Sequence, residues 1–350
     1  MARLALAAHD PGGAAVLAAA APALRGAGHD LAWLPAGPAA KLWHEAGETV
    51  SEALDVAAAT ATLERLAPDL LVTGTSFHDG FERALWAAAR RLGVPSFAVL
   101  DAWSNIARRF QSPDGSREQP DAFGVMDEAT RADVAAAGWC RARLFVIGQP
   151  HLAARTERLK QRRQNRHSGV GRQFEKQIVF FSEPILEDFG PTARGFTQFE
   201  VATLVAEVFT GSAAVRLAIK PHPRESEVVW LDWLANVPNV RLATEETEAI
   251  LGVADGVLGM TTMVLLEACL AGIPALSLQP GRPTPANPII DSMLPIITRR
   301  ADAAETLSAW VAGLTSPPPP PPSARDILAG GGARMTEAVY EILTSAGSKA

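Results

Sequence analysis

Short apolar segments alternate with alanine-rich helical segments along most of this 350-residue chain. In the first half, the segments of strand type are residues 4–8, 31–34, 70–73, 97–100, 123–126 and 144–147. Segments of helix type lie between them, at residues 14–25, 57–66, 81–92 and 129–137. Buried-type strands joined by helices are typical of a parallel sheet that is covered on both faces. The pattern therefore predicts an α/β fold.

The same alternation resumes after a break at residues 148–150 (GQP). Predicted strands are residues 178–181, 217–219, 240–242, 257–258 and 275–278. Predicted helices are residues 196–210, 228–234, 246–251 and 262–271. The halves share one architecture without an internal sequence repeat. We therefore expect two Rossmann-like, doubly wound parallel-sheet domains that face a central cleft.

The connecting segments set the expected domain boundaries. Residues 1–150 and 177–316 form the two Rossmann-like domains. Between them, residues 151–176 contain eight Lys or Arg against two Glu, and we expect a basic helix that leads into a polar linker. Residues 317–350 begin with six prolines, which form a stiff spacer, and end in a helix near residues 335–344 that docks onto a domain.

Composition excludes several classes of protein. Hydrophobic residues make up 48% of the chain, enough for two cores, and the net charge of −6 argues against a general nucleic-acid binder. Cys140 and Cys269 have neither metal nor redox spacing, which suits a reducing cytosol. Residues 1–8 resemble the start of a signal peptide, but the polar residues 9–13 interrupt it, so a buried first strand is the better interpretation. Because no apolar run is long enough to cross a bilayer, we expect a soluble cytoplasmic protein.

Residues 220–224 (KPHPR) follow a predicted strand and bring three groups that can be cationic, Lys220, His222 and Arg224. The loop ends of parallel strands lie at one edge of the sheet, where ligands bind. A histidine between two prolines is often only part of a surface turn, but its basic neighbours favour a functional role. His222 is therefore a candidate to hold a phosphate or to assist a leaving group.

Residues 259–267 (GMTTMVLLE) follow another short predicted strand. Thr261 or Thr262 stands where a helix N-cap belongs, and a helix N-terminus with hydroxyl groups is a ready site for phosphate. Glu267 lies in an apolar stretch, where a carboxylate needs a partner such as a ribose. Together with the basic loop, these residues predict a site for a nucleotide monophosphate or diphosphate.

Over residues 215–280, this arrangement resembles the donor half of GT-B glycosyltransferases. The resemblance rests on the His-Pro pair with its basic neighbours and on the Thr-capped helix that carries Glu. It is closest to bacterial sialyltransferases, Kdo-transferases and capsule-polysaccharide enzymes, in which a His-Pro pair and a later Ser/Thr pair hold a CMP-sugar. UDP-N-acetylglucosamine 2-epimerases and CDP-glycerol glycerophosphotransferases share much of this architecture. The sialyltransferase pattern also has an acidic Asp-Gly motif, for which residues 78–80 (HDG) are the nearest match.

The N-terminal half offers two candidate general bases. Asp10 ends the first strand in the glycine loop of residues 9–13, which is often only a turn but in this fold faces the expected cleft. Asp79 lies in the loop of residues 73–80, which a helix N-cap alone would also explain, and it is the base that the resemblance implies. We expect acceptor-binding side chains in the same loops, namely His9, Gly12, Gly13 and Ser76.

Two further loops complete the expected site. Residues 100–105 carry Asp101, Trp103 and Asn105, a platform suited to sugar stacking and hydroxyl recognition, although a packed loop would look the same. Glu183 ends the first strand of the second half and is expected to contact the donor. The basic residues 155–172 suit anionic lipid or a lipid-linked acceptor, but we favour a solvated helix end and linker.

These features predict a metal-independent GT-B glycosyltransferase of surface-polysaccharide or glycoconjugate assembly. Its substrates are a CMP- or UDP-sugar and a glycan, lipid-linked or protein acceptor, without a separate cofactor. The second domain binds the donor, and a carboxylate of the first deprotonates the acceptor hydroxyl. The alternatives are a UDP-N-acetylglucosamine 2-epimerase, a CDP-alditol phosphotransferase, and a noncatalytic subunit that binds nucleotide sugars. Sequence leaves open the sugar, the acceptor, the stereochemical outcome, the oligomeric state and any association with the inner face of the membrane.

Overall fold

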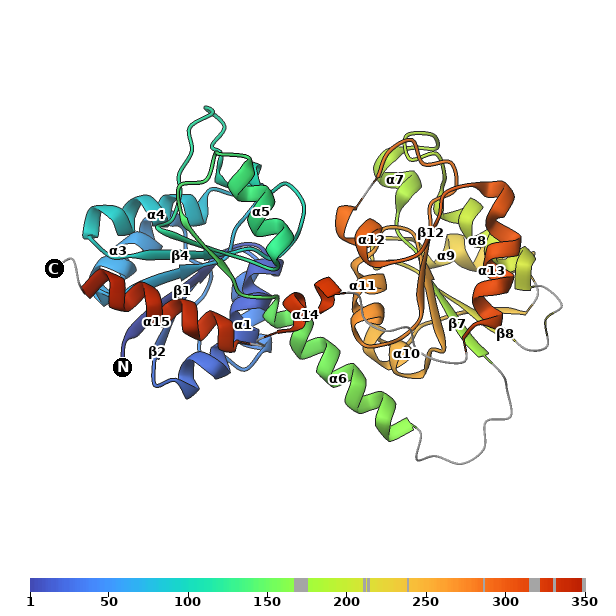
Figure 1. Ribbon diagram of the computed structural model, residues 1–350, viewed down its shortest axis with the longest axis horizontal. Helices are drawn as coiled ribbons and strands as arrows, with labels where there is room; N and C mark the ends of the chain where they lie inside the picture. Colours follow the sequence, from blue (N-terminus) through green and yellow to red (C-terminus); the bar gives the residue numbers. More distant parts are fainter. Residues whose placement is uncertain are drawn as a thin grey trace. The chain divides into compact units, whose positions relative to one another are not determined.

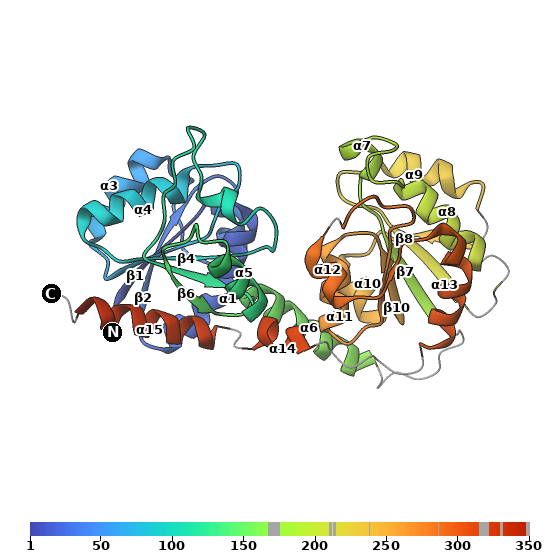
Figure 2. The ribbon, with the colours of Figure 1, turned by 45° about the horizontal axis from the view of Figure 1, so that its top comes forward.

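The computed structural model describes residues 1–166, 176–209, 212, 215–237, 239–285, 287–314, 322–329 and 332–347. The chain divides into unit 1, Met1–Ala154 with the residues from Pro322 onward, and unit 2, Arg155–Pro321. Each unit contains a six-stranded parallel sheet with helices packed against it (Figures 1 and 2). The prediction of two doubly wound parallel sheets is confirmed, and the cleft expected between the domains stays a prediction.

Unit 1 has the strand order β2-β1-β3-β4-β5-β6. Its elements are β1 (Arg3–Ala8), α1 (Pro11–Gly26), β2 (Asp30–Pro35), α2 (Ala39–Glu45), α3 (Val56–Leu66), β3 (Leu70–Thr73), α4 (Phe81–Leu92), β4 (Ser96–Val99), the 3-10 helix η1 (Ala107–Phe110), β5 (Ala122–Val125), α5 (Glu128–Ala136), β6 (Arg143–Val146), α14 (Pro322–Leu328) and α15 (Ala333–Gly347). Helix α6 (Pro150–Arg166) begins in this unit and continues into the next.

Unit 2 has the strand order β12-β11-β10-β7-β8-β9. Its elements are β7 (Lys176–Phe181), α7 (Ile185–Phe189), α8 (Gln198–Phe209), β8 (Val215–Lys220), α9 (Glu227–Leu234), β9 (Val240–Leu242), α10 (Thr247–Val253), β10 (Gly256–Gly259), α11 (Met263–Leu270), β11 (Ala275–Leu278), α12 (Pro288–Met293), β12 (Ile296–Ile297), η2 (Arg300–Asp302) and α13 (Ala303–Ala312). Much of the predicted linker and nearly all of the proline spacer lie outside the described residues.

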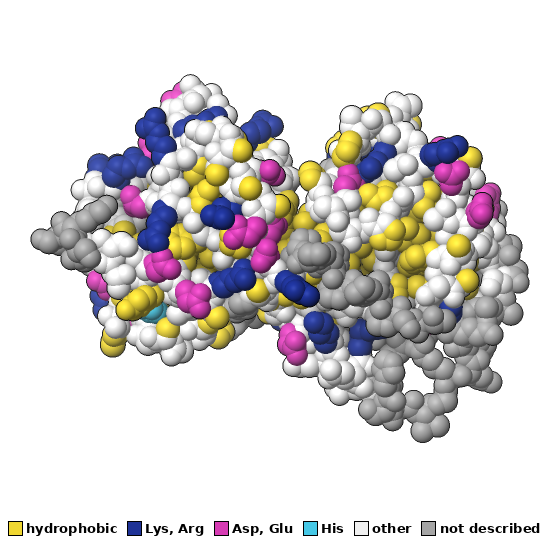
Figure 3. All heavy atoms as spheres, in the orientation of Figure 1, with side chains coloured by type: hydrophobic (Ala, Val, Ile, Leu, Met, Phe, Trp, Pro, Cys, Tyr) yellow, Lys and Arg dark blue, Asp and Glu magenta, His cyan; other side chains and the backbone are white. Residues whose placement is uncertain are grey.

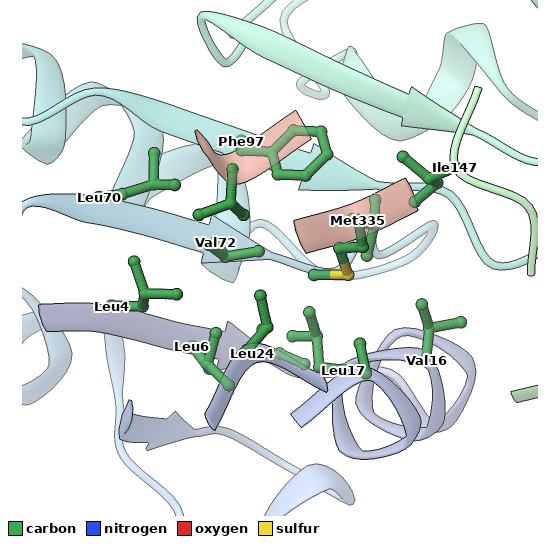
Figure 4. Packing of buried hydrophobic residues seen from close by; sticks show 14 of the residues in the cluster. Leu4, Leu6, Val16, Leu17, Leu24, Leu70, Val72, Phe97, Ile147 and Met335 are labelled. Carbon is green, nitrogen blue, oxygen red and sulfur yellow. The ribbon is translucent and has the colours of Figure 1, made fainter. Parts of the chain in front are cut away.

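The strands of unit 1 are apolar on both faces because each face is covered by helices. Leu4 and Leu6 of β1 join one buried cluster with α1 and α15, whereas Ala5 and Ala7 join a second cluster with α3 and α4. Figure 4 shows the first cluster, in which side chains of β1, β3 and β4 lie beside those of α1 and α15. Each fully buried leucine contributes roughly 1.5–3 kcal/mol to folding. This core therefore fixes the strand ends from which the edge loops start.

The C-terminal helix α15 belongs to unit 1. Met335, Val339 and Ile342 are buried in the cluster that α1 also lines, and Leu343 packs against it. The predicted docking of this helix is confirmed. The chain also returns through α14, since the Gln149 N–H donates to the carbonyl of Ile327 (2.9 Å). Within the described residues, no helix combines the length and apolar character needed to cross a membrane.

Each sheet has one point where the chain reverses its direction of winding. In unit 1 this point lies between β1 and β3, because β2 is added on one side of β1 and β3 on the other. In unit 2 it lies between β7 and β10 for the same reason. Loops at the carboxyl ends of such strand pairs diverge and leave room for ligands. The loops after β1, β3, β7 and β10 are therefore where a site is expected.

Candidate functional site

The unit 1 candidate site lies at the carboxyl ends of β1, β3 and β4, in residues 9–13, which include the first turn of α1, and in the loops of residues 74–80 and 100–105. Glycines let these loops approach one another. A Cβ atom on Gly13 would lie 2.9 Å from the Cα of Gly74, and one on Gly12 would lie 1.8 Å from Oδ2 of Asp101. Neither position has room for a side chain, so the glycine pair in the first loop serves a close packing of three loops.

His9 lies between the two candidate bases. Its Nδ1 is 2.8 Å from Oδ1 of Asp10, and its Nε2 is 3.7 Å from Oδ2 of Asp79. The other oxygen of Asp10 accepts the Phe77 N–H (3.2 Å), and the Asp10 side chain does not cap α1 although it stands at the N-cap position. Because Nδ1 of a neutral imidazole must carry the proton to donate to a carboxylate, Nε2 is left as a proton acceptor.

Glu82 in the first turn of α4 ties the loops after β1 and β3 together. Its Oε1 accepts the His9 N–H (2.9 Å) and the Ser76 hydroxyl (2.8 Å). The side chain is buried, and burial raises the pKa of its carboxyl group, with the two hydrogen bonds opposing that shift. The hydroxyl of Ser76, a predicted acceptor ligand, is thus engaged by the protein itself.

Arg109 of η1 organises the loop after β4. Its guanidinium donates to Oδ1 of Asp101 (2.6 Å) and to the carbonyl of Thr75 (2.8 Å), and both charged side chains are largely buried. Burial raises the pKa of Asp101, and the positive charge of Arg109 opposes that shift. Asn105 turns the chain into η1 with a left-handed backbone (φ +56°). Such a conformation is costly for most residues other than glycine and is tolerated best by Asn and Asp.

Trp103 is half-buried and has a fixed orientation. Its indole N–H donates to Oδ2 of Asp127 (2.6 Å), whose other oxygen caps α5 through the Thr130 N–H (2.6 Å). The side-chain amide of Gln149 donates to the Asp101 carbonyl (3.2 Å). The acceptor-binding residues predicted from sequence are therefore brought to one sheet edge, where Arg109, Glu82 and Asp127 hold several of them.

In unit 2, Glu183 and Thr261 meet where β7 and β10 end. The Thr261 N–H donates to Oε2 of Glu183 (2.6 Å), its hydroxyl donates to Oε1 (2.7 Å), and the Thr262 N–H also donates to this carboxylate. Burial raises the pKa of Glu183, with these hydrogen bonds opposing the shift. Thr262 caps α11 by accepting the Val264 N–H (3.3 Å), as the sequence predicts. The N–H groups expected to bind phosphate are thus bound by Glu183.

His222 lies in the loop after β8, and β8 pairs with β7. Its Nδ1 accepts the Arg224 N–H (3.2 Å), so the proton of the neutral ring is on Nε2. Burial and the positive charge of Arg224 lower the pKa of His222. Glu225 holds the loop by accepting the His222 N–H (2.6 Å) and the Ser182 hydroxyl (2.9 Å). His222 is therefore a neutral hydrogen-bond donor near neutral pH.

Two predicted donor ligands have partners within the protein. The Arg224 guanidinium forms a bidentate pair with Asp188 (2.8 and 2.6 Å). Glu267 is buried on α11, and one of its oxygens lies 2.9 Å from the Arg155 guanidinium of α6, although the contact is not aligned as a hydrogen bond. Burial raises the pKa of Glu267, and Arg155 opposes that shift. The carboxylate that the sequence assigns to ribose has a partner in α6 instead.

Several residues of these clusters have no motif in the sequence, namely Glu82, Asp127, Asp188, Glu225 and Gln149. A carboxylate in the first turn of a helix is a common surface feature, and nothing nearby in the chain signals that Glu82 is buried. Within the described residues, no group of three or more His, Cys, Asp or Glu side chains is arranged to hold a metal ion.

The chain resembles solved structures in fold. It matches no family model and no curated protein. UDP-GlcNAc 2-epimerase from Neisseria meningitidis, bound to UDP-GlcNAc, superposes with a TM-score of 0.68 at 12% identity, over 98% of this chain and 100% of that one. MurG from Acinetobacter baumannii gives 0.55 at 13% identity over 98% and 99%. The glycotransferase of kitacinnamycin gives 0.59 at 15% identity over 97% and 99%. The chain therefore has the GT-B fold.

Proposed function

We propose that the protein is a glycosyltransferase that uses a nucleotide-activated sugar, with the acceptor bound by unit 1 and the donor by unit 2. The observation that carries this proposal is the pair formed by Asp10 and His9 at the reversal point of unit 1. When the ring of His9 is neutral and donates from Nδ1 to Asp10, its Nε2 is a proton acceptor, which is the group needed to deprotonate an acceptor hydroxyl. Solved structures of this fold include enzymes named as glycosyltransferases, such as that of calicheamicin.

In the proposed reaction, the acceptor hydroxyl gives its proton to Nε2 of His9 while its oxygen bonds to the anomeric carbon of the sugar. The bond from that carbon to the phosphate oxygen breaks, and the nucleotide leaves with the electron pair. A positive charge that develops on the ring of His9 is stabilised by the hydrogen bond to Asp10 (2.8 Å), with Asp79 on its other side (3.7 Å). Asp10 thus acts through His9, and neither carboxylate takes the proton itself.

Unit 2 supplies the donor site of this proposal. The Nε2–H of His222 and the ammonium group of Lys220 stabilise the negative charge that develops on the leaving phosphate, a role that Mg²⁺ fills in many other enzymes. Trp103 and Asn105 in unit 1 contact the acceptor, which belongs to the glycan, lipid-linked or protein class. Involvement in surface-polysaccharide or glycoconjugate assembly follows from the proposed donor and acceptor.

The second candidate function is epimerisation of a nucleotide sugar at C2. It is favoured by the TM-score of 0.68 to the Neisseria epimerase, against 0.59 to the glycotransferase of kitacinnamycin. The same His9 ring would then remove the proton from the carbon next to the anomeric centre. This reaction needs no acceptor, which separates it from transfer.

The experiment that tests the proposal compares turnover of UDP- and CMP-sugars by the wild-type protein with and without an acceptor mixture. Acceptor-dependent release of nucleotide is expected, together with its loss in His9→Gln. His44→Gln is the matched control, because His44 is an exposed residue of α2. Turnover without acceptor would establish the epimerase, and nucleotide binding without any turnover would establish a noncatalytic subunit.

A further inference from the structure

The first turn of α11 already holds an anion, the carboxylate of Glu183. Its two oxygens accept the N–H and the hydroxyl of Thr261 at 2.6 and 2.7 Å, and the Thr262 N–H as well. A side-chain amide, that of Asn287, fixes the same turn from the other side by donating to the Thr261 carbonyl (3.1 Å). These are short, charge-assisted hydrogen bonds in a largely buried position, so the carboxylate is a firm part of this loop.

The next N–H groups of the turn also have acceptors within the chain. The Thr262 hydroxyl accepts the Val264 N–H (3.3 Å), and the Thr262 carbonyl accepts the Leu265 N–H (3.2 Å). A phosphate group that approached α11 would therefore find few donors and the carboxylate of Glu183, which repels it when ionised. Two like charges within about 4 Å of each other near a protein surface repel strongly.

Two of the other cations at this edge of unit 2 are neutralised by carboxylates. Arg224 is paired with Asp188, and Arg282 is paired with Asp291 (2.6 Å). Glu225 adds another carboxylate beside His222. Among the described residues, neither Lys220 nor Arg194 is in an ion pair, but the positive charge of Arg194 acts on Glu183, so Lys220 and the neutral His222 are the groups left to receive a phosphate. A site with one cation and one neutral hydrogen-bond donor suits a ligand with a single negative charge better than a ligand with two or more negative charges.

We propose that Glu183 is a specificity-determining residue of the donor site, which makes unit 2 select a nucleotide carrying one phosphate over the same nucleotide carrying two. This inference rests on the proposed function, since it concerns the nucleotide that unit 2 binds. The single phosphate lies at Lys220 and His222. Glu183 occupies the turn of α11 where a second phosphate would otherwise be bound, and repels it.

The test measures dissociation constants by calorimetry for the base-matched pairs UMP and UDP, CMP and CDP, and GMP and GDP. For the preferred base, the wild-type protein is expected to bind the monophosphate at least as tightly as the diphosphate. Glu183→Gln keeps the shape of the side chain, and its amide can still accept the Thr261 N–H while donating to the Thr261 hydroxyl. We expect this variant to bind the diphosphate at least tenfold more tightly, with little change for the monophosphate.

Glu187→Gln is the matched control, because Glu187 lies on α7 and bonds to Gln198 (2.7 Å) rather than to α11. It removes one charge from the same region and should leave the preference unchanged. Wild-type protein that binds a diphosphate tenfold more tightly than its monophosphate would overturn the inference, even if Glu183→Gln fails to fold. Loss of that binding in His222→Ala would then leave the proposed donor site standing. If no nucleotide binds at all, the proposed function fails along with the inference.

Discussion

The two sheet edges carry histidines of opposite polarity. In unit 1, Nδ1 of His9 faces a carboxylate, to which a neutral ring donates while Nε2 accepts, whereas in unit 2 Nδ1 of His222 accepts a backbone N–H, so Nε2 of the neutral ring donates. The residue type is the same, and the neighbour of one ring nitrogen decides the chemistry of the other. In the proposed function, the histidine of unit 1 therefore acts as a base and that of unit 2 as a donor of hydrogen bonds. Figure 3 shows Lys and Arg side chains interspersed with Asp and Glu side chains on one face of each unit.

The largest effect is expected from moving the ring proton of His9 from Nδ1 to Nε2. In Asp10→Asn, the amide can donate to Nδ1, which moves the ring proton to Nε2 and removes the base. Turnover should fall by about 10²-fold or more, since general-base catalysis is typically worth that much, while nucleotide affinity stays the same. Steady-state rates at saturating donor measure this.

Asp79→Asn is the matched control, because Asp79 lies 3.7 Å from the other ring nitrogen, beyond hydrogen-bond distance. We expect it to have the smaller effect on turnover. An inactive Asp79→Asn beside a nearly normal Asp10→Asn would reverse the two roles and make Asp79 the carboxylate that acts on His9.

The packing of the unit 1 edge predicts a cost in stability for Gly12→Ala. The new Cβ would lie 1.8 Å from Oδ2 of Asp101, so the carboxylate that Arg109 holds must move. Overpacking of this kind costs about 1–3 kcal/mol of unfolding free energy. Gly26→Ala, in the same helix, is the control, because its Cβ would meet no atom within 4 Å. Chemical denaturation of both variants measures the difference, and equal stability would show that the loop yields easily.

In unit 2, removal of the imidazole ring of His222 should weaken binding of the leaving phosphate. His222→Ala is expected to lower nucleotide affinity or turnover by more than tenfold, which corresponds to about 1.4 kcal/mol. Calorimetric titration together with initial rates provides the measurement. Unchanged binding and turnover in a folded variant would show that His222 is not part of the donor site. The contrast between the two histidines would then have no functional meaning.

The smallest effect concerns the pH dependence of stability at the unit 1 edge. Because burial raises the pKa of Glu82, the folded state binds this proton more tightly than the unfolded chain does. The stabilisation is therefore present at acidic pH and is lost as the pH rises through the raised pKa. Glu82→Gln should gain stability relative to wild type as the pH rises from 4.5, the ordinary value for Glu, by about 1.4 kcal/mol per unit of pKa shift. Melting curves from pH 4 to 8 test this, and a pH-independent difference would contradict it.

The sheets were predictable from sequence because their signal is local. The predicted strands 70–73, 240–242 and 275–278 coincide with β3, β9 and β11, and most others differ by one or two residues at an end. The predicted elements omit α2, α7 and α12, which are too short for a helical period to repeat. They also omit α13, although its ten residues are long enough to show one.

The candidate sites were predictable in position but not in pairing. A polar loop after a buried strand marks the carboxyl edge of a parallel sheet, which is how His9, Asp10, Glu183 and His222 were found. Their partners lie far away in the chain, as with Glu183 and Thr261, 78 positions apart, and Glu82 and His9, 73 positions apart. Local patterns carry no information about such contacts.

The sequence by itself thus determined two parallel α/β halves and the loops that carry their polar side chains. The periodicity of a strand or a helix is visible over a few neighbouring residues. Only the tertiary structure decided that Glu82 holds the backbone of His9, that Glu183 binds the turn of α11, and that Glu267 pairs with Arg155. These outcomes depend on which loops the strand order brings together. The chemistry of an imidazole or a carboxylate is set by the few atoms that touch it, and folding alone supplies them.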